Sequence, residues 1–241
     1  YDYEYDSLED PHVYPGTRIL RNRFGIKHQD LLSELESQIT DSKFVKSKQS
    51  DDDIPTGNFD LKHLQAVHKY LFGELYDWAG EIRQQGFISK GQSVFCLAPM
   101  IESYARGIFS KMQRENFTEM DVKQCACKLA YYLSEVNALH PFREGNTSAV
   151  IVFAILLAKH LGFEVDHELF RVHSSYVRNA LVWASQGMYS EYQYIEKIFF
   201  DAILHEDSTE KKFSESKSAK YEKIGDYKVG DYVERPHEYK K

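Results

Sequence analysis

This sequence contains few cysteines, and its basic residues do not outnumber its acidic ones. Only Cys96, Cys125 and Cys127 occur, and their spacing fits neither a disulfide framework nor a zinc signature. We interpret them as small packing residues in a reducing compartment. The formal net charge is −7, and no stripe of Lys and Arg with interleaved aromatic residues appears. Both features argue against a nucleic-acid-binding surface.

Long hydrophobic runs are also missing. The longest continuous apolar run, residues 149–158, is too short to span a bilayer, so we expect no membrane span. No signal peptide and no internal repeat is visible, and we expect a cytoplasmic protein. The histidines lack the spacing of metal ligands on a helix, so we expect no transition metal.

What the sequence does contain is a series of amphipathic segments. Apolar residues recur at three- and four-residue spacing, with Gly or Pro near several ends of these segments. This pattern predicts an all-α fold with one core in residues 11–205. The predicted helices cover about residues 30–40, 60–78, 100–116, 119–139, 146–162, 167–187 and 189–205.

The two ends differ from this helical part. Residues 1–10 carry five acidic and no basic residues, and we expect an exposed, poorly ordered lead-in. Residues 206–241 form a polar tail that either stays mobile or lies across the domain. Between them, residues 85–98 contain two β-prone stretches separated by turn residues that include glycine. This pattern predicts a hairpin.

Residues 140–146, which read H-P-F-R-E-G-N, are the most informative segment. Pro141 disfavours a helical conformation at His140 and so ends the preceding helix there, while Phe142 supplies an apolar anchor for the loop. The next helix opens directly after Gly145. Its first-turn amides lack partners within the helix and its dipole favours negative charge, so they suit a phosphate group.

The side chains of this segment suit phosphate chemistry. His140 can accept a proton near neutral pH, as a general base for a hydroxyl nucleophile requires. Glu144 offers the kind of ligand that Mg²⁺ prefers beside bound phosphates. Together they predict nucleotidyl or phosphoryl transfer. The alternative is an ordinary helix–loop–helix connection, in which each of these residues also occurs.

Three segments together resemble the Fic family, whose members mostly transfer AMP from ATP to protein hydroxyls. They are residues 140–146, residues 72–83 (F-G-E-L-Y-D-W-A-G-E-I-R) and residues 13–17 (V-Y-P-G-T), and the similarity covers about residues 10–204. The resemblance implies a Fic-like helical bundle that binds ATP and Mg²⁺. It also implies a β-hairpin flap over the active site, although a purely structural hairpin is the alternative.

The same resemblance assigns roles to individual residues. His140 would deprotonate a Ser, Thr or Tyr of the target, and Glu144 would bind the magnesium on the diphosphate. Gly145 and Asn146 would form the anion hole, and Phe142 would be the structural anchor. The flap would dock the target through its main-chain edge. Its docking residues would be Lys90, Gly91, Gln92, Ser93, Val94 and Phe95.

The chain departs from the family pattern after Asn146. Where the family has a small residue, an arginine and often a second arginine, this sequence has Thr147, Ser148 and Ile151. A hydroxyl cannot match an arginine fork on phosphate. The main-chain amides remain, so we expect Thr147 and Ser148 to contribute to nucleotide binding through the backbone. The proposed replacement cations are Arg143, Lys90 and Arg178.

A second family feature is an inhibitory helix that carries Ser or Thr four residues before a Glu. Ser218 and Glu222 in the tail have this spacing. However, the arginine that such a glutamate would meet is replaced by Ile151, and an unpaired buried carboxylate is costly. A solvated tail is therefore our default expectation, with inhibition as the alternative.

The sequence thus predicts a protein adenylyltransferase whose substrate is a protein hydroxyl, including one on the enzyme itself. Activity that is slow or that uses another nucleotide is compatible with the missing arginines. One alternative is a Fic-like regulatory or binding module without productive catalysis, and another is a phosphodiesterase that removes AMP from a modified protein. The oligomeric state stays open. Because some family members are effectors, secretion into another cell is the alternative to a cytoplasmic location.

Overall fold

The computed structural model describes residues 4–5, 10–49, 54–84, 86, 88–90 and 93–204. Two sets of predicted site residues fall outside it. Gly91 and Gln92 of the expected flap lie outside the described residues, and so do Ser218 and Glu222 of the tail. The side chains of Lys90 and Ser93 are likewise outside what the structure describes.

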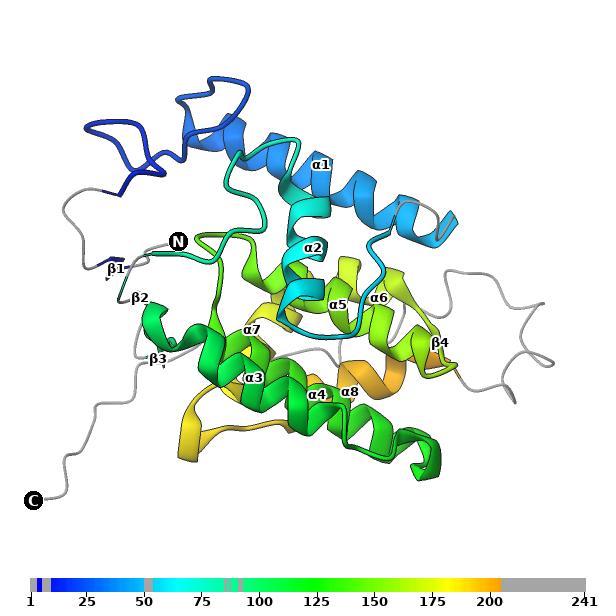
Figure 1. Cartoon of the computed structure of the whole chain (residues 1–241). Helices are drawn as coiled ribbons and strands as arrows, with labels where there is room; N and C mark the ends of the chain where they lie inside the picture. Colours follow the sequence, from blue (N-terminus) through cyan, green and yellow to red (C-terminus); the bar gives the residue numbers. More distant parts are fainter. Residues whose placement is uncertain are drawn as a thin grey trace, which may run out of the picture. The chain divides into compact units, whose positions relative to one another are not determined.

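The prediction of an all-α fold is confirmed. Within the described residues the chain forms eight α-helices, and its strands are only two or three residues long (Figure 1). The helices are α1 (Gln29–Gln49), α2 (Leu61–Phe72), α3 (Ile101–Met112), α4 (Val122–Leu139), α5 (Asn146–His160), α6 (His167–Val172), α7 (Ser174–Ala184) and α8 (Gln193–Ala202).

The chain divides into two compact units rather than showing one undivided core. Helices α4 and α5 each contribute residues to both units, and the segment 140–146 belongs wholly to the first. The first unit comprises Tyr1–Ser89, Val94–Glu115 and Val136–Ala154, and the second comprises Lys90–Ser93, Asn116–Glu135 and Ile155–Lys241.

Helix α2 is central to the first unit. It begins after Asp60, whose side chain accepts a hydrogen bond of 2.9 Å from the His63 amide and so caps the helix. Helix α1 packs against it (Figure 1). The buried face of α2 repeats at helical spacing, as an amphipathic helix requires. It consists of His63, Leu64, Val67, His68, Leu71 and Phe72.

The predicted helix over residues 60–78 is too long, because α2 ends at Phe72. Gly73 forms its C-cap, and glycine is a poor helix former. The residues that follow turn back so that the rings of Tyr76 and Trp78 stack, with their centroids 4.5 Å apart. Burial of two large aromatic rings favours this turn over a longer helix.

The predicted hairpin is present, and it has a third strand. Strands β2 (Ile88–Lys90) and β3 (Ser93–Val94) are neighbours in one sheet, and β1 (Glu4–Tyr5) pairs antiparallel with β2. Glu4 lies opposite Ser89, and Tyr5 lies opposite Ile88. Glu4 and Tyr5, which belong to the expected lead-in, thus pair with the edge of this sheet through their main chains.

In the second unit, the predicted helix over residues 167–187 is two helices. Helix α6 ends at Val172, the amide of its C-cap residue His173 donates to the Leu169 carbonyl, and α7 begins at Ser174. Two successive serines have low helix propensity, which favours a break there. Strands β4 (Glu164–Val165) and β5 (Ile203–Leu204) pair antiparallel in the same unit.

None of the helices that the structure describes is both long and apolar enough to cross a membrane. In the described part of the chain, no group of three or more His, Cys, Asp or Glu side chains is arranged to hold a metal ion.

Candidate active site

The segment 140–146 connects α4 to α5, and it breaks the chain direction at His140. His140 has a φ of +45°, in the left-handed region that few non-glycine residues adopt. Its amide donates to the Asn137 carbonyl over 3.1 Å, and Pro141 follows. Such a conformation costs about 1 to 3 kcal/mol and persists only where surrounding contacts enforce it.

Arg83 provides three of the contacts around this turn, and it is only 2% exposed. Its Nε donates to the His140 carbonyl over 2.6 Å, and its amide donates to the Pro141 carbonyl over 2.9 Å. Its Nη2 donates to the carbonyl of Cys96, the second residue after β3. No local pattern indicates this role, since neither spacing nor composition distinguishes Arg83 from the other arginines.

The imidazole of His140 is held by stacking. It lies face to face with the ring of Phe95, with centroids 3.8 Å apart and planes inclined by 18°. His140 is 3% exposed and Phe95 is 7% exposed. We expected Phe95 among the docking residues of the flap, but it is buried against the histidine instead. Val94 of strand β3, the residue before Phe95, is 62% exposed.

Asn146 closes the loop. Its Oδ1 accepts from the Phe142 amide and its Nδ2 donates to the Phe142 carbonyl, each over 2.9 Å. The buried side-chain amide is thereby used on the backbone of the loop. At the start of α5, the group that Asn146 can offer an anion is its own main-chain N–H.

Gly145 is required by both its backbone and its surroundings. Its φ is +76°, which disfavours any residue with a Cβ. A Cβ at this position would lie 2.4 Å from the ring of Phe72. Because Gly145 has no side chain, the N-terminus of α5 can lie close to Phe72 of α2. The first helical hydrogen bond of α5 follows, since the Ala149 amide donates to the Gly145 carbonyl over 3.1 Å.

His68 on α2 supports the loop from below. Its Nε2 lies 2.9 Å from the Glu144 carbonyl, and its Nδ1 accepts from the Gly80 amide over 2.9 Å. Since a carbonyl only accepts and an amide only donates, these partners fix the neutral tautomer with the proton on Nε2. Burial lowers the pKa of His68 to about 4, which agrees with a neutral ring. The ring also stacks on Phe142, at 3.9 Å.

Glu144 is half-buried, and its Oε1 accepts from the Gly145 amide over 3.2 Å. Its negative charge affects the pKa of Glu36 on α1. Burial and then the negative charge of Glu144 raise the pKa of Glu36 to about 7, although a hydrogen bond from Tyr76 opposes the shift. A partly exposed carboxylate in a negative environment attracts a divalent cation, so Glu144 fits a magnesium ligand.

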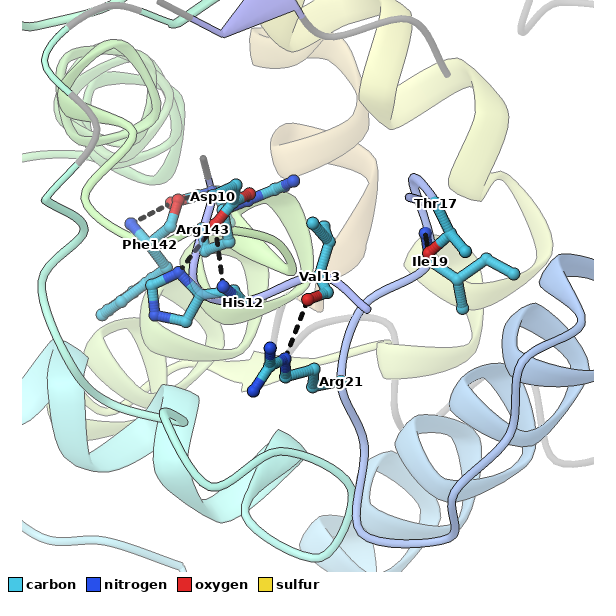
Figure 2. A network of polar contacts seen from close by, with 9 residues as sticks. Asp10, His12, Val13, Thr17, Ile19, Arg21, Phe142 and Arg143 are labelled. Carbon is cyan, nitrogen blue, oxygen red and sulfur yellow. Dashed lines mark hydrogen bonds and ion pairs between the residues drawn. The ribbon is translucent and has the colours of Figure 1, made fainter. Parts of the chain in front are cut away.

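Arg143 is paired with the beginning of the described chain (Figure 2). Its Nε lies 2.6 Å from Asp10 Oδ2, and both side chains are more than nine-tenths buried. Asp10 Oδ1 also accepts from the His12 amide over 2.9 Å. Burial alone would raise the pKa of Asp10, but the hydrogen bonds from His12 and the charge of Arg143 outweigh it and hold this pKa well below its usual value.

This network bears on two expectations. Asp10, the last residue of the expected lead-in, is buried against Arg143 and supports the loop. Arg143, proposed as a replacement cation, already pairs with a carboxylate. Of the other proposed cations, Arg178 lies in α7 of the second unit, where burial lowers its pKa.

The first turn of α5 has a different character from the loop. Thr147 is half-buried, Ser148 is exposed, and Ile151 is 8% exposed and belongs to the apolar core. Ile151 therefore serves packing where the family pattern often has an arginine. What this turn offers an anion is its set of main-chain N–H groups, which have no acceptor inside the helix.

The family model that matches this chain is that of the Fic/DOC family, over residues 58–158. The chain is 37% identical over 166 residues to the probable protein adenylyltransferase y4lH of Sinorhizobium fredii, covering 67% of this chain and 82% of that protein. It is 36% identical to the protein adenylyltransferase VbhT of Bartonella schoenbuchensis, covering 68% of this chain and 34% of VbhT. This chain belongs to the Fic/DOC family.

Solved structures share the fold. The Bartonella tribocorum effector protein BepC with bound AMPPNP superposes with a TM-score of 0.72 at 23% identity, covering 82% of this chain and 98% of that one. The Fic domain of a Bartonella quintana cell filamentation protein with bound ADP gives 0.73 at 21% identity, covering 84% and 98%. The prediction of a Fic-like helical bundle is thus confirmed.

Proposed function

We propose that this protein is an adenylyltransferase that transfers AMP from Mg-ATP to a hydroxyl side chain of a protein. The observation that carries the proposal is the tightly held segment 140–146, which presents an imidazole, a carboxylate and the start of a helix within seven residues. Its membership in a family with relatives named protein adenylyltransferases supports the same reaction.

In this proposal His140 is the general base. It takes the proton from a Ser, Thr or Tyr hydroxyl as the hydroxyl oxygen bonds to the α-phosphorus of ATP. The bond between the α-phosphorus and the bridging oxygen breaks, and pyrophosphate leaves with its electron pair. The products are AMP-modified protein and pyrophosphate, and the proton passes from the imidazole to solvent.

Glu144 would hold the magnesium ion. One carboxylate is sufficient because Mg²⁺ usually completes its six positions with water and substrate phosphates. When bound, the ion neutralises charge on the diphosphate of ATP.

The main-chain amides from Asn146 to Ser148 would receive the phosphates at the start of α5. Without the two arginines, phosphate contacts worth about 1.5 to 3 kcal/mol each are lost. We therefore propose weak ATP binding or slow transfer rather than loss of the chemistry. The acceptor is a protein hydroxyl, with the enzyme itself as one acceptor, and strand β3 offers its edge to the target.

A regulatory module without catalysis is the second proposal. It is favoured by the burial of Ile151 and by the pairing of Arg143 with Asp10, since neither position then supplies a cation to the nucleotide. The two proposals share the fold and differ in whether ATP is consumed.

Incubation with Mg-ATP labelled at the α-phosphate separates them. The acceptors are the protein itself and a mixed protein extract, and His140→Ala is compared with the parent. The matched control is His28→Ala, which removes an exposed histidine. Transfer that disappears only in His140→Ala supports the enzyme. No label in any sample, together with no nucleotide binding by calorimetry, establishes the module instead.

A further inference from the structure

Arg83 forms hydrogen bonds to two segments that are far apart in the sequence. One is the strand segment that leaves the hairpin, where Arg83 Nη2 donates to the Cys96 carbonyl. The other is the turn at the end of α4, where its Nε and its amide donate to the carbonyls of His140 and Pro141. One buried side chain thus fixes the spacing between the hairpin and the turn.

Two further contacts tie the same segments together without Arg83. The Cys96 amide donates to the Ala138 carbonyl over 3.1 Å, and the ring of Phe95 stacks on that of His140. Phe95 follows β3 directly, and its amide donates to the Ile88 carbonyl of β2 over 3.1 Å. The hairpin register and the plane of the imidazole are therefore set by one continuous group of contacts.

The chemistry of Arg83 is unusual for a residue with only a packing role. A guanidinium that is 2% exposed carries a large desolvation cost, and apolar residues usually fill such positions more favourably. What a guanidinium adds is several donors in a rigid fork, which can reach two carbonyl groups at once. One of those carbonyls belongs to the residue whose φ is +45°.

We propose that Arg83 is a positioning residue that holds His140 in its left-handed conformation and couples its imidazole to the flap through Cys96 and Phe95. The role in transfer rests on the proposed function, since it concerns the orientation of the proposed base. A target segment that pairs along β3 would lie one residue from Phe95. The position of the target and the orientation of the His140 ring would therefore depend on the same contacts. Misalignment by about 1 Å lowers such a step about 100-fold.

The test uses the full chain with Arg83→Lys and Arg83→Gln. Neither replacement can donate to both carbonyls in the fixed geometry of the fork. The matched control is Arg106→Lys, at an exposed position of α3. The first readout is the carbon-bound ring proton resonances of His140, assigned with His140→Ala. The stacked ring of Phe95 displaces these resonances upfield, so they report the stacking without any need for activity.

We expect the His140 resonances of both Arg83 variants to lose this upfield displacement while thermal unfolding still shows a folded protein. Phe95→Leu, which leaves both hydrogen bonds of Arg83 in place, should do the same. In AMP transfer, kcat should fall about 100-fold with KM changed less than about threefold. Arg106→Lys should change none of these values.

An unchanged His140 spectrum in a folded Arg83 variant overturns the proposal, whether or not the parent transfers AMP. If both Arg83 variants unfold, Phe95→Leu decides in their place: a His140 spectrum like that of the parent rejects the coupling to the flap. A rise of KM with kcat unchanged also rejects it, since that result assigns Arg83 to substrate binding. Failure of the proposed function alone would remove transfer from the parent and leave the spectral difference intact.

Discussion

The loop 140–146 and the first turn of α5 lie next to each other in the sequence and are built in different ways. Arg83, His68 and Asp10 each reach the loop from elsewhere in the first unit, and Asn146 closes it. In the turn that follows, Ser148 is exposed and Ile151 is buried in the core.

The loop is therefore the more sensitive of the two regions to mutation. It carries the proposed base and metal ligand, and their geometry depends on contacts made by single side chains, each of which one mutation can remove. The helix start can bind an anion through its backbone, whose N–H groups persist whatever side chains are present. Mutations before Asn146 should therefore damage the site, and mutations after it should tune affinity.

The largest effect is expected from Gly145→Ala. The new methyl group would meet the Phe72 ring at 2.4 Å in a backbone with φ of +76°, so we expect a loss of about 2 to 4 kcal/mol of unfolding free energy. Thermal or urea unfolding measures it. Gly107→Ala in α3 is the control, because nothing lies within 4 Å of its added Cβ and alanine favours a helix. Equal stability of the two variants would refute a rigid loop.

Asp10→Asn should have the next largest effect, a loss of about 2 to 3 kcal/mol at pH 7, since it leaves the buried Arg143 without its counter-charge. The folded-state pKa of Asp10 is lowered, so this stabilisation is present above the unfolded pKa of about 4 and is lost as the pH falls below it. Urea unfolding at pH 7 and pH 3 should show the difference between parent and variant shrinking at the lower pH.

The control for that experiment is Asp77→Asn, which breaks the exposed pair with Arg23. Exposed pairs contribute little, so its effect should stay below about 0.5 kcal/mol at either pH. If Asp10→Asn behaves like Asp77→Asn, the N-terminal contact to the loop has no energetic importance.

The smallest effect tests the other half of the comparison. Ser148→Arg should tighten Mg-ATP binding about tenfold in calorimetry, because an arginine at this exposed position can add a charge-assisted contact to a phosphate. Ser33→Arg adds the same charge at an exposed position of α1 and should leave the affinity within twofold. An unchanged affinity in Ser148→Arg would mean that another cation already fills that role.

Much of this arrangement follows from local sequence. The break at His140 and Pro141, the start of α5 after Gly145 and the hairpin each depend on neighbouring residues, and their positions were predictable. The overlong helix at residues 60–78 arose because the aromatic residues after Gly73 continue a helix-like apolar pattern while they pack in a turn.

The supports of the loop were not predictable in the same way. Asp10 meets Arg143 across 133 positions and His68 meets Glu144 across 76, so no spacing rule connects either pair. The acidic composition of residues 1–10 favoured an unstructured segment, but at Asp10 the buried pair with Arg143 outweighed it. Tertiary contacts of this kind leave no local pattern in a single sequence.

The central claim is tested most directly by comparing two labels in the same acceptor. Parallel reactions with Mg-ATP labelled at the α-phosphate or at the γ-phosphate are followed over time with the parent and with His140→Ala. Adenylyl transfer predicts that the α-label alone enters protein and that His140→Ala abolishes its entry. Incorporation of the γ-label, or undiminished α-label in His140→Ala, would contradict the assignment of this loop as an AMP-transferring site.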